Sequence, residues 1–180
     1  MTTIKNYFET DLQTDLLLKK TKKNAFEAVK LEKIILNAGV KDANTTSNKI
    51  LPALLIMKLI THQQPIYTKA RKSIANFKLR EGKIIGCKTT LRNKNMYNFL
   101  EKIVHLVIPQ QTEVKNYKYK NRRPNNSITF GVPDANIFPE MENQFELFNK
   151  ITGLNITLCS LDKKLNKDNL IFSGFKIKFH

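Results

Sequence analysis

Positive charge is concentrated between positions 66 and 92. This stretch, IYTKARKSIANFKLREGKIIGCKTTLR, holds eight Lys or Arg residues and one acid, Glu81. Apolar residues lie between the cations at strand-like intervals, which indicates that the charge is displayed on a folded element. Basic runs are usually solvated surface, but here scarcely any acid compensates the charge. The stretch therefore predicts a surface that neutralises the phosphates of a polyanion.

Residue types that carry out catalysis or bind metal ions form no recognisable set. His62, His105 and His180 lie far apart, and none has a partner at the spacing of a metal site. Glycine-rich phosphate loops and nucleophile motifs do not occur in the sequence. Cys87 and Cys159 lie in apolar, strand-like contexts and are expected to be core thiols. We therefore expect no enzyme, no cofactor, no metal ion and no small-molecule substrate.

Most of the net charge lies in one part of the sequence. The net charge is +16 over 180 residues, and residues 29–123 hold 20 Lys or Arg against 5 acids. A membrane partner is not expected, because the densest apolar stretch, ILPALLIMKLI, is short and contains Lys58. The length predicts a single domain, residues 1–180. Its excess of positive charge predicts that it binds nucleic acid.

The elements that position these residues can be predicted from hydrophobic spacing. Apolar residues at i, i+4 near the N-terminus predict a helix, and LEKIILNAGV predicts a strand followed by a turn at Asn-Ala-Gly. A helix then stops before Pro65, with its start uncertain because of Pro52. Two strands joined near residues 76–83 follow, and then a helix with Asn95 as a plausible cap and Pro109 just past its end.

The remaining chain predicts two more strands, SITFGV and GLNITLCS, and a weak helix with a possible last strand at the C-terminus. Residues 110–127 are expected to form a loop. Because side chains alternate along a strand, Lys88, Thr90 and Arg92 should lie on the face opposite Cys87, Thr89 and Leu91. The order of elements predicts an α+β fold, a mainly antiparallel sheet with helices packed on one face and a basic RNA-binding face.

Five segments in order resemble a known family. They are LEKIILNAGV, ITHQQPIYTKARKSIANFKLREGKIIGCKTTLR, MYNFLEKIVHLVIP, GVPDANIFPE and GLNIT. These motifs are similar to the bacterial-type large-subunit ribosomal protein five, over residues 4–160. The resemblance implies a non-catalytic structural protein of the central protuberance, which binds 5S ribosomal RNA and neighbouring large-subunit RNA. It also implies contacts with the P-site transfer RNA, a small-subunit head protein and neighbouring ribosomal proteins.

The resemblance places Asn37, Gln63 and Thr90 where the family's sheet meets 5S RNA. With nearby cations, the expected rRNA-binding residues are Lys33, Asn37, Gln63, Lys69, Lys88, Thr90 and Arg92. The family's transfer-RNA loop falls on RKSIANFKLREGK, which implies that role for Arg71, Lys72, Lys78 and Arg80. Amides suit base edges and 2′-hydroxyls because they donate and accept hydrogen bonds at once.

Residues 124–149 carry four acids and no Lys or Arg, which would repel a phosphate backbone. We interpret Asp134, Glu140 and Glu142 as a protein-bridge candidate facing a basic small-subunit protein, although a solvated acidic loop would look the same. The Glu140 and Glu142 pair is expected on a loop. Residues 110–126 and the C-terminus depart from the family pattern, so contacts from those regions are not carried over.

The compartment is indicated by codon bias. The chain has 19 Asn and 26 Lys against 5 Arg, which is typical of an A+T-rich genome. We expect a mitochondrial ribosome in the matrix, with a plastid or a bacterial cytoplasm as alternatives. A stand-alone RNA-processing or RNA-modifying protein and a general RNA chaperone remain as alternative functions. The sequence leaves open whether the ribosome retains a 5S RNA.

Overall fold

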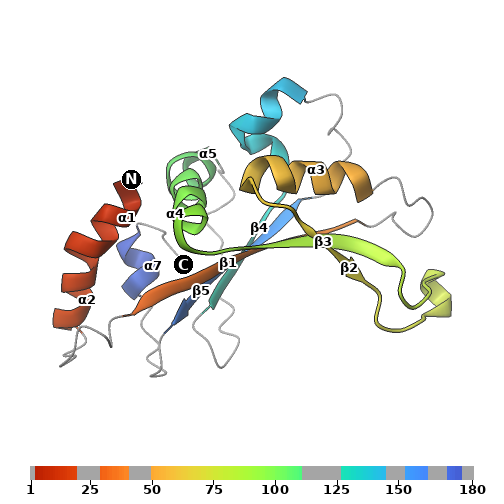
Figure 1. Ribbon diagram of the computed structural model, residues 1–180, viewed down its shortest axis with the longest axis horizontal. Helices are drawn as coiled ribbons and strands as arrows, with labels where there is room; N and C mark the ends of the chain where they lie inside the picture. The colour runs from red at the N-terminus through yellow and green to blue at the C-terminus, as the bar shows by residue number, and fades with distance from the viewer. Residues whose placement is uncertain are drawn as a thin grey trace. The chain divides into compact units, whose positions relative to one another are not determined.

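The protein forms a five-stranded sheet with helices, shown in Figure 1 as a computed structural model. The structure describes residues 3–19, 29–40, 50–110, 127–144, 153–161 and 170–175. The strands are β1 (Lys30–Gly39), β2 (Ile66–Lys69), β3 (Ile84–Leu91), β4 (Ser127–Val132) and β5 (Leu154–Leu161). They lie in the order β2-β3-β1-β5-β4 in an antiparallel sheet. The predicted α+β class is confirmed.

The helices include several short and irregular segments. The α-helices are α1 (Thr3–Tyr7), α2 (Gln13–Lys19), α3 (Ile50–Thr61), α4 (Asn93–Lys102), α5 (Ile108–Gln110) and α7 (Leu170–Gly174). The π-helical segments are η1 (Phe8–Leu12) and η6 (Ile103–Val107). The 3-10 helices are η5 (Ala75–Phe77), η8 (Ala135–Ile137) and η9 (Pro139–Gln144).

The chain divides into two compact units. The first comprises Met1–Ile34, Leu91–Phe130 and Thr157–His180, and the second Ile35–Thr90 and Gly131–Ile156. Four strands, β1, β3, β4 and β5, contribute residues to both units. The expected single domain, residues 1–180, stays a prediction.

The first unit has an aromatic core built on the N-terminal helices. Phe8 stacks on Phe175 with ring centroids 5.8 Å apart, and its ring lies 6.1 Å from that of Tyr97. A side chain at Gly174 would collide with Leu12, so glycine lets α7 approach η1 closely. The predicted N-terminal stripe is confirmed, because all four of its members are buried: Ile4, Phe8, Leu12 and Leu16.

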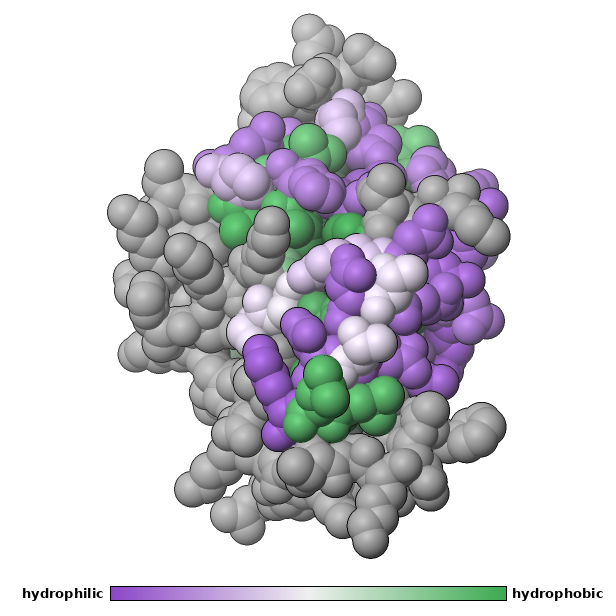
Figure 2. Space-filling model, turned by 90° about the vertical axis from the view of Figure 1, so that its left-hand side faces the viewer, coloured by the Kyte–Doolittle hydropathy of each residue, from purple (hydrophilic) through white to green (hydrophobic). Residues whose placement is uncertain are grey.

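The exposed face of this region is mainly polar. Figure 2 views the molecule from the side on which α1 and α2 lie in Figure 1, and shows mainly hydrophilic residues, with hydrophobic ones exposed in more than one place. Leu18 of α2 is one of the exposed large hydrophobic residues, at 77%. Isolated apolar side chains of this kind are normal on protein surfaces.

The second unit is organised around α3. Met57 of α3 lies over β3, where the thiol of Cys87 contacts the Met57 sulfur at 3.1 Å. Ile56 and Ile60 of the same helix are fully buried. Pro52 is the third residue of α3, in the first turn, where its missing N–H would have no intrahelical partner in any case. The predicted helix is therefore confirmed, with Ile50 as its first residue.

Three details of the sequence prediction were wrong. Asn95 is not a cap, because α4 begins at Asn93 after an extended Arg92 without a side-chain cap. The helix also runs past Pro109 to Gln110. In a regular α-helix the ring of Pro109 would clash with the carbonyl of His105, four residues earlier. Here His105 lies in the wider π turn of η6, which makes room for the ring. The turn expected at Asn-Ala-Gly is strand, because β1 continues to Gly39.

Other predicted elements are confirmed or lie outside the described residues. The alternating strands near 127–132 and 153–160 are β4 and β5. The expected C-terminal helix is α7, while the loop at 111–126 and a strand after residue 175 lie outside the described residues. Within the described ranges, the helices are too short or too polar to cross a membrane.

The stability of the second unit should depend on pH through Cys87. Burial raises the pKa of this thiol from 9.0 to about 11. Because the folded state holds the proton more tightly, stability should be full below pH 9 and fall by roughly 3 kcal/mol between pH 9 and 11. Denaturant unfolding across that range, compared with Cys87→Val, measures the difference. Parallel pH curves for the two proteins would contradict this expectation.

Candidate RNA interface

The side chains of β3 lie alternately on a buried and a polar face. The buried ones are Cys87, Thr89 and Leu91. Lys88 and Arg92 are exposed, and Thr90 is half-buried. The predicted alternation is therefore confirmed, and it presents a cation, a hydroxyl and a second cation at every other position.

Asn37 lies exposed on β1, next to β3 in the sheet. The N–H of Val40 donates to the carbonyl of Ile85 at 3.0 Å, and continuing that antiparallel register brings Asn37 level with Lys88. On the other side of β3, Ile66 of β2 pairs with Lys88. We call Asn37, Lys88 and Thr90 the polar strand face.

Gln63 is fixed beside this face by the end of α3. Its backbone N–H donates to the Thr61 hydroxyl, which itself donates to the carbonyl of Met57 at 2.6 Å. The amide Nε2 of Gln63 then donates to the carbonyl of Thr90 at 3.2 Å. One amide N–H is thus engaged in positioning, and the amide oxygen remains an acceptor for a ligand.

Lys69 is exposed at the end of β2. The β2–β3 register shifts between Thr68 and Lys69, so the strand pair is irregular where the chain leaves the sheet. This irregularity comes directly before the cation-rich loop that joins the two strands.

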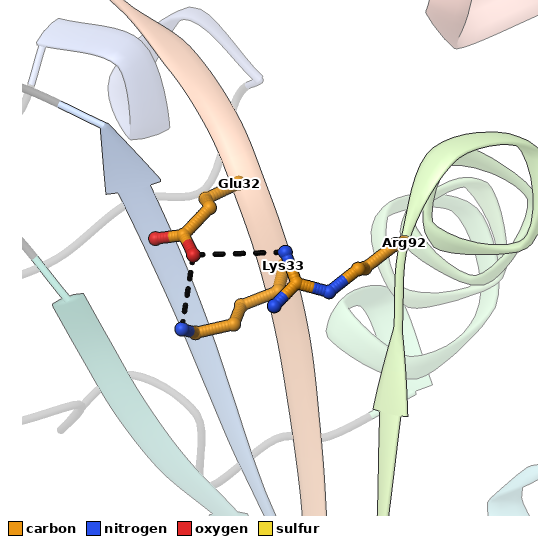
Figure 3. Close-up of polar contacts among 3 residues, drawn as sticks. All are labelled: Glu32, Lys33 and Arg92. Carbon is orange, nitrogen blue, oxygen red and sulfur yellow. Dashed lines mark hydrogen bonds and ion pairs between the residues drawn. The ribbon is translucent and has the colours of Figure 1, made fainter.

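Lys33 and Arg92 share a carboxylate, that of Glu32. Lys33 Nζ lies 3.0 Å and Arg92 Nη1 3.6 Å from the same oxygen of Glu32. Figure 3 shows the two cations converging on it from β1 and from the end of β3. The Glu32 side chain is 24% exposed and that of Arg92 is 55% exposed. The guanidinium of Arg92 is therefore exposed to solvent but paired with the Glu32 carboxylate.

Cys159 on β5 lies close enough to this cluster to be influenced by it. Burial raises the pKa of its thiol, the Lys33 ammonium lowers it and the Glu32 carboxylate raises it. Both cysteines are free and buried, as the sequence predicted. The part of the chain that the structure describes holds no cluster of His, Cys, Asp or Glu that could bind a metal ion.

The loop between β2 and β3, residues 70–83, is closed by its own backbone; we call it the hairpin loop. Ala70 donates its N–H to Lys83, and Gly82 donates to Ala70. Nearer the tip, Ile74 and Leu79 exchange backbone hydrogen bonds of 2.9 and 3.1 Å. In Figure 1 this loop extends from the ends of β2 and β3. The four cations assigned to transfer RNA are all exposed on it: Arg71, Lys72, Lys78 and Arg80.

The backbone of Lys78 adopts a left-handed conformation with φ of 51°. A side chain other than glycine is disfavoured there by about 1–2 kcal/mol. This conformation ends η5, whose C-cap residue is Lys78.

The acidic residues lie on short 3-10 helices. Asp134 is exposed just before η8, and Glu140 is half-buried in η9. Glu142 also belongs to η9, although its side chain lies outside the described residues. The expected loop at Glu140 and Glu142 is therefore wrong, because buried Phe138 and Met141 anchor this segment to the core.

Two features of the surface were missed by sequence reasoning. Glu32 was not recognised as the partner of Lys33 and Arg92, although it is the only acid among residues 29–41. The exposed apolar residues at the tip of the hairpin loop, Ile74 and Phe77, were also missed. Their signal was an aromatic residue within the basic stretch 66–92.

Comparisons with known proteins cover nearly the whole chain. A family model described as Ribosomal protein L5 matches residues 24–80, and one that describes the C-terminus of the same ribosomal family matches residues 84–179. A relative named Large ribosomal subunit protein uL5m from Reclinomonas americana is 38% identical over 177 residues, which are 98% of this chain and 97% of the relative. The protein of the same name from Prototheca wickerhamii is 38% identical over 194 residues, which cover 98% of this chain and 83% of the relative.

Proposed function

The chain belongs to the ribosomal protein L5 family, and from this premise we propose which surface meets which partner in the ribosome. As a member of that family it is a structural constituent of the large ribosomal subunit and not an enzyme. Its relatives carry the mitochondrial form of the name, and the chain is accordingly a protein of the mitochondrial ribosome. The predicted family membership is therefore confirmed.

The polar strand face and Gln63 bind 5S ribosomal RNA in this proposal. The observation that carries it is the alternation on β3, which presents Lys88 and Thr90 on the face opposite the core. Gln63 is held to the Thr90 carbonyl, so its amide lies beside the residue that carries the hydroxyl. Such groups read base edges and 2′-hydroxyls, whereas cations alone supply affinity without sequence choice. Lys69 supplies a phosphate contact in the second unit, and Lys33 and Arg92 supply phosphate contacts in the first.

Binding to 5S RNA against an unrelated structured RNA of equal length, across a salt series, tests this assignment. We expect a preference for 5S RNA that survives at high salt. Asn37→Ala or Thr90→Val should reduce that preference by about 1–3 kcal/mol and leave the salt slope nearly unchanged. Equal affinities that fall together with salt would contradict 5S recognition, and large-subunit RNA would then be the partner to test.

Arg92 and Glu32 should change the salt dependence in opposite directions. Arg92→Ala removes one phosphate contact, so the slope of log K against log salt should fall by about 0.9. Glu32→Gln removes the counter-charge and should raise affinity severalfold at low salt, because both cations become available to phosphate. Equal slopes for wild type and Arg92→Ala would refute the phosphate contact.

The hairpin loop contacts the P-site transfer RNA in this proposal. Its support is the group of four exposed cations on a backbone that is closed by its own hydrogen bonds. A preformed loop loses little conformational entropy when it binds RNA. More of the attraction between its cations and the phosphates therefore contributes to the binding affinity. The family resemblance assigns the same segment to transfer RNA.

The acidic segment faces a basic protein of the small-subunit head in this proposal. Its support is the absence of Lys and Arg from residues 124–149, with Asp134 exposed next to η8. Charge reversal at Asp134, Glu140 and Glu142 should weaken subunit association more at low than at high salt, because exposed charges act over about 10 Å at 0.1 M salt. Unchanged association at low salt would remove this bridge.

A further inference from the structure

Phe77, at the tip of the hairpin loop, is exposed in a way that the fold does not require. Its side chain is 69% exposed, and Ile74 at the same tip is 42% exposed. Apolar side chains are more favourably placed away from water, and a single exposed one is unremarkable on its own. Here the aromatic residue lies next to Lys78, on a loop that also exposes Arg71, Lys72 and Arg80. That combination points to a ligand.

The backbone around Phe77 is fixed. Phe77 is the last residue of η5, and the next residue, Lys78, donates its N–H to the carbonyl of Ala75 at 2.9 Å. The Ser73 hydroxyl accepts the N–H of Glu81 at 2.9 Å, which holds the two sides of the loop together. The loop's polar backbone is thus largely occupied internally, and recognition at the tip is left to side chains.

We propose that Phe77 is a stacking platform for an unpaired nucleobase of the RNA that the hairpin loop contacts. This inference rests on the proposed contact between the hairpin loop and transfer RNA, and adds to it the chemical group that is recognised. An aromatic ring offers its face to the face of a base, while neighbouring cations neutralise the phosphates on either side. Arg71 and Lys72 on one side of the tip and Arg80 on the other supply those cations.

A nucleobase fits this tip better than an apolar protein surface does. Burying the tip in an apolar interface would also take Lys78, the neighbour of Phe77, out of water without a counter-charge, which is strongly unfavourable. An RNA loop provides a flat apolar surface and a counter-charge within one nucleotide of each other. Because the stacked base is read by its face, the platform tolerates different bases.

The test uses the full chain with transfer RNA and, separately, with 5S RNA, each carrying single 2-aminopurine substitutions at unpaired positions. Phe77→Leu keeps an apolar side chain but removes the ring, and Phe77→Trp keeps the ring. We expect Phe77→Leu to lower affinity about 5- to 140-fold, which is about 1–3 kcal/mol at 1.4 kcal/mol per tenfold. Phe77→Trp should bind at least as well as wild type, and one substituted position should lose fluorescence on binding.

Two further variants separate the possible outcomes. Leu18→Ala removes an even more exposed apolar side chain, on α2, and should bind RNA as wild type does. If Arg80→Gln weakens transfer-RNA binding while Phe77→Leu does not, stacking is refuted and the hairpin contact stands. If both variants bind as wild type does, the hairpin contact fails too. If fluorescence changes only with 5S RNA, the stacked base belongs to ribosomal RNA, and the transfer-RNA source is overturned.

A membrane is the competing partner for a basic tip with an aromatic residue. Vesicles containing anionic lipid, added in place of RNA, should bind wild type and Phe77→Leu equally and only at low salt. The proposal would be overturned if Phe77→Leu bound vesicles more weakly than wild type does but bound RNA equally well.

Discussion

Neutralising the four hairpin cations together is expected to lower the affinity for transfer RNA by about 2–3 orders of magnitude at ~0.15 M salt. The variant replaces Arg71, Lys72, Lys78 and Arg80 with Gln. Each phosphate contact contributes about 0.7–0.9 to the slope of log K against log salt, so four contacts lower the slope by about 3. All four side chains are exposed, so the fold should keep its stability. A filter-binding or fluorescence titration at four salt concentrations measures both quantities.

The matched control has the same change in net charge at other places. It replaces the exposed Lys19, Lys30, Lys58 and Lys94 with Gln. If the hairpin loop is the contact, this control should lose much less affinity for transfer RNA. The hairpin variant should also retain its preference for 5S RNA, because the polar strand face is intact. Equal losses in both variants would mean that net charge, and not the hairpin loop, attracts transfer RNA.

Replacing Gly86 with Ala is expected to destabilise the protein by about 3 kcal/mol, the upper part of the range for overpacking. A Cβ at this position would collide with the carbonyl oxygen of Ala38. It would also lie 3.0 Å from the Thr68 hydroxyl and 3.3 Å from the Cα of Gly39. Two of these three atoms are backbone on β1, so they can move only if the strands separate. Denaturant unfolding measures the loss.

Gly39→Ala is the control for this substitution. A Cβ there would meet nothing within 4 Å, so stability should change by less than about 0.5 kcal/mol. Because β1 and β3 carry Asn37 and Thr90, separating the strands should also weaken 5S discrimination in Gly86→Ala beyond what unfolding explains. Equal stability of the two variants would show that the strands tolerate a wider spacing than the structure has.

The sequence predicted the parts of the fold that follow from hydrophobic spacing. The N-terminal stripe from Ile4 to Leu16 and the alternation on β3 depend on which side chains avoid water, and both are confirmed. The π turns in η1 and η6 could not be predicted, because one widened turn leaves the apolar spacing almost unchanged. The run of helix past Pro109 depends on that turn and was missed for the same reason.

The site was predicted in its residues more than in its geometry. The exposed cations of β3 and the outward face of Thr90 followed from strand alternation, whereas Asn37 was expected in a turn and lies on β1. The Gln63 bond to the Thr90 carbonyl joins residues 27 positions apart, and no local pattern reveals such a contact. The same holds for Arg92 and Glu32, which are distant in the sequence and meet only because their strands are close. The contacts of these residues with RNA stay predictions.

The self-contained backbone of the hairpin loop has a consequence for how this protein can change over generations. Main-chain hydrogen bonds close this loop at its base and near its tip, and the Ser73 hydroxyl accepts one more from a backbone N–H. The side chains at the tip can therefore be exchanged without altering the scaffold that carries them. If the tip contacts RNA as proposed, a change in the facing nucleotides can be matched by a substitution here at little loss of stability.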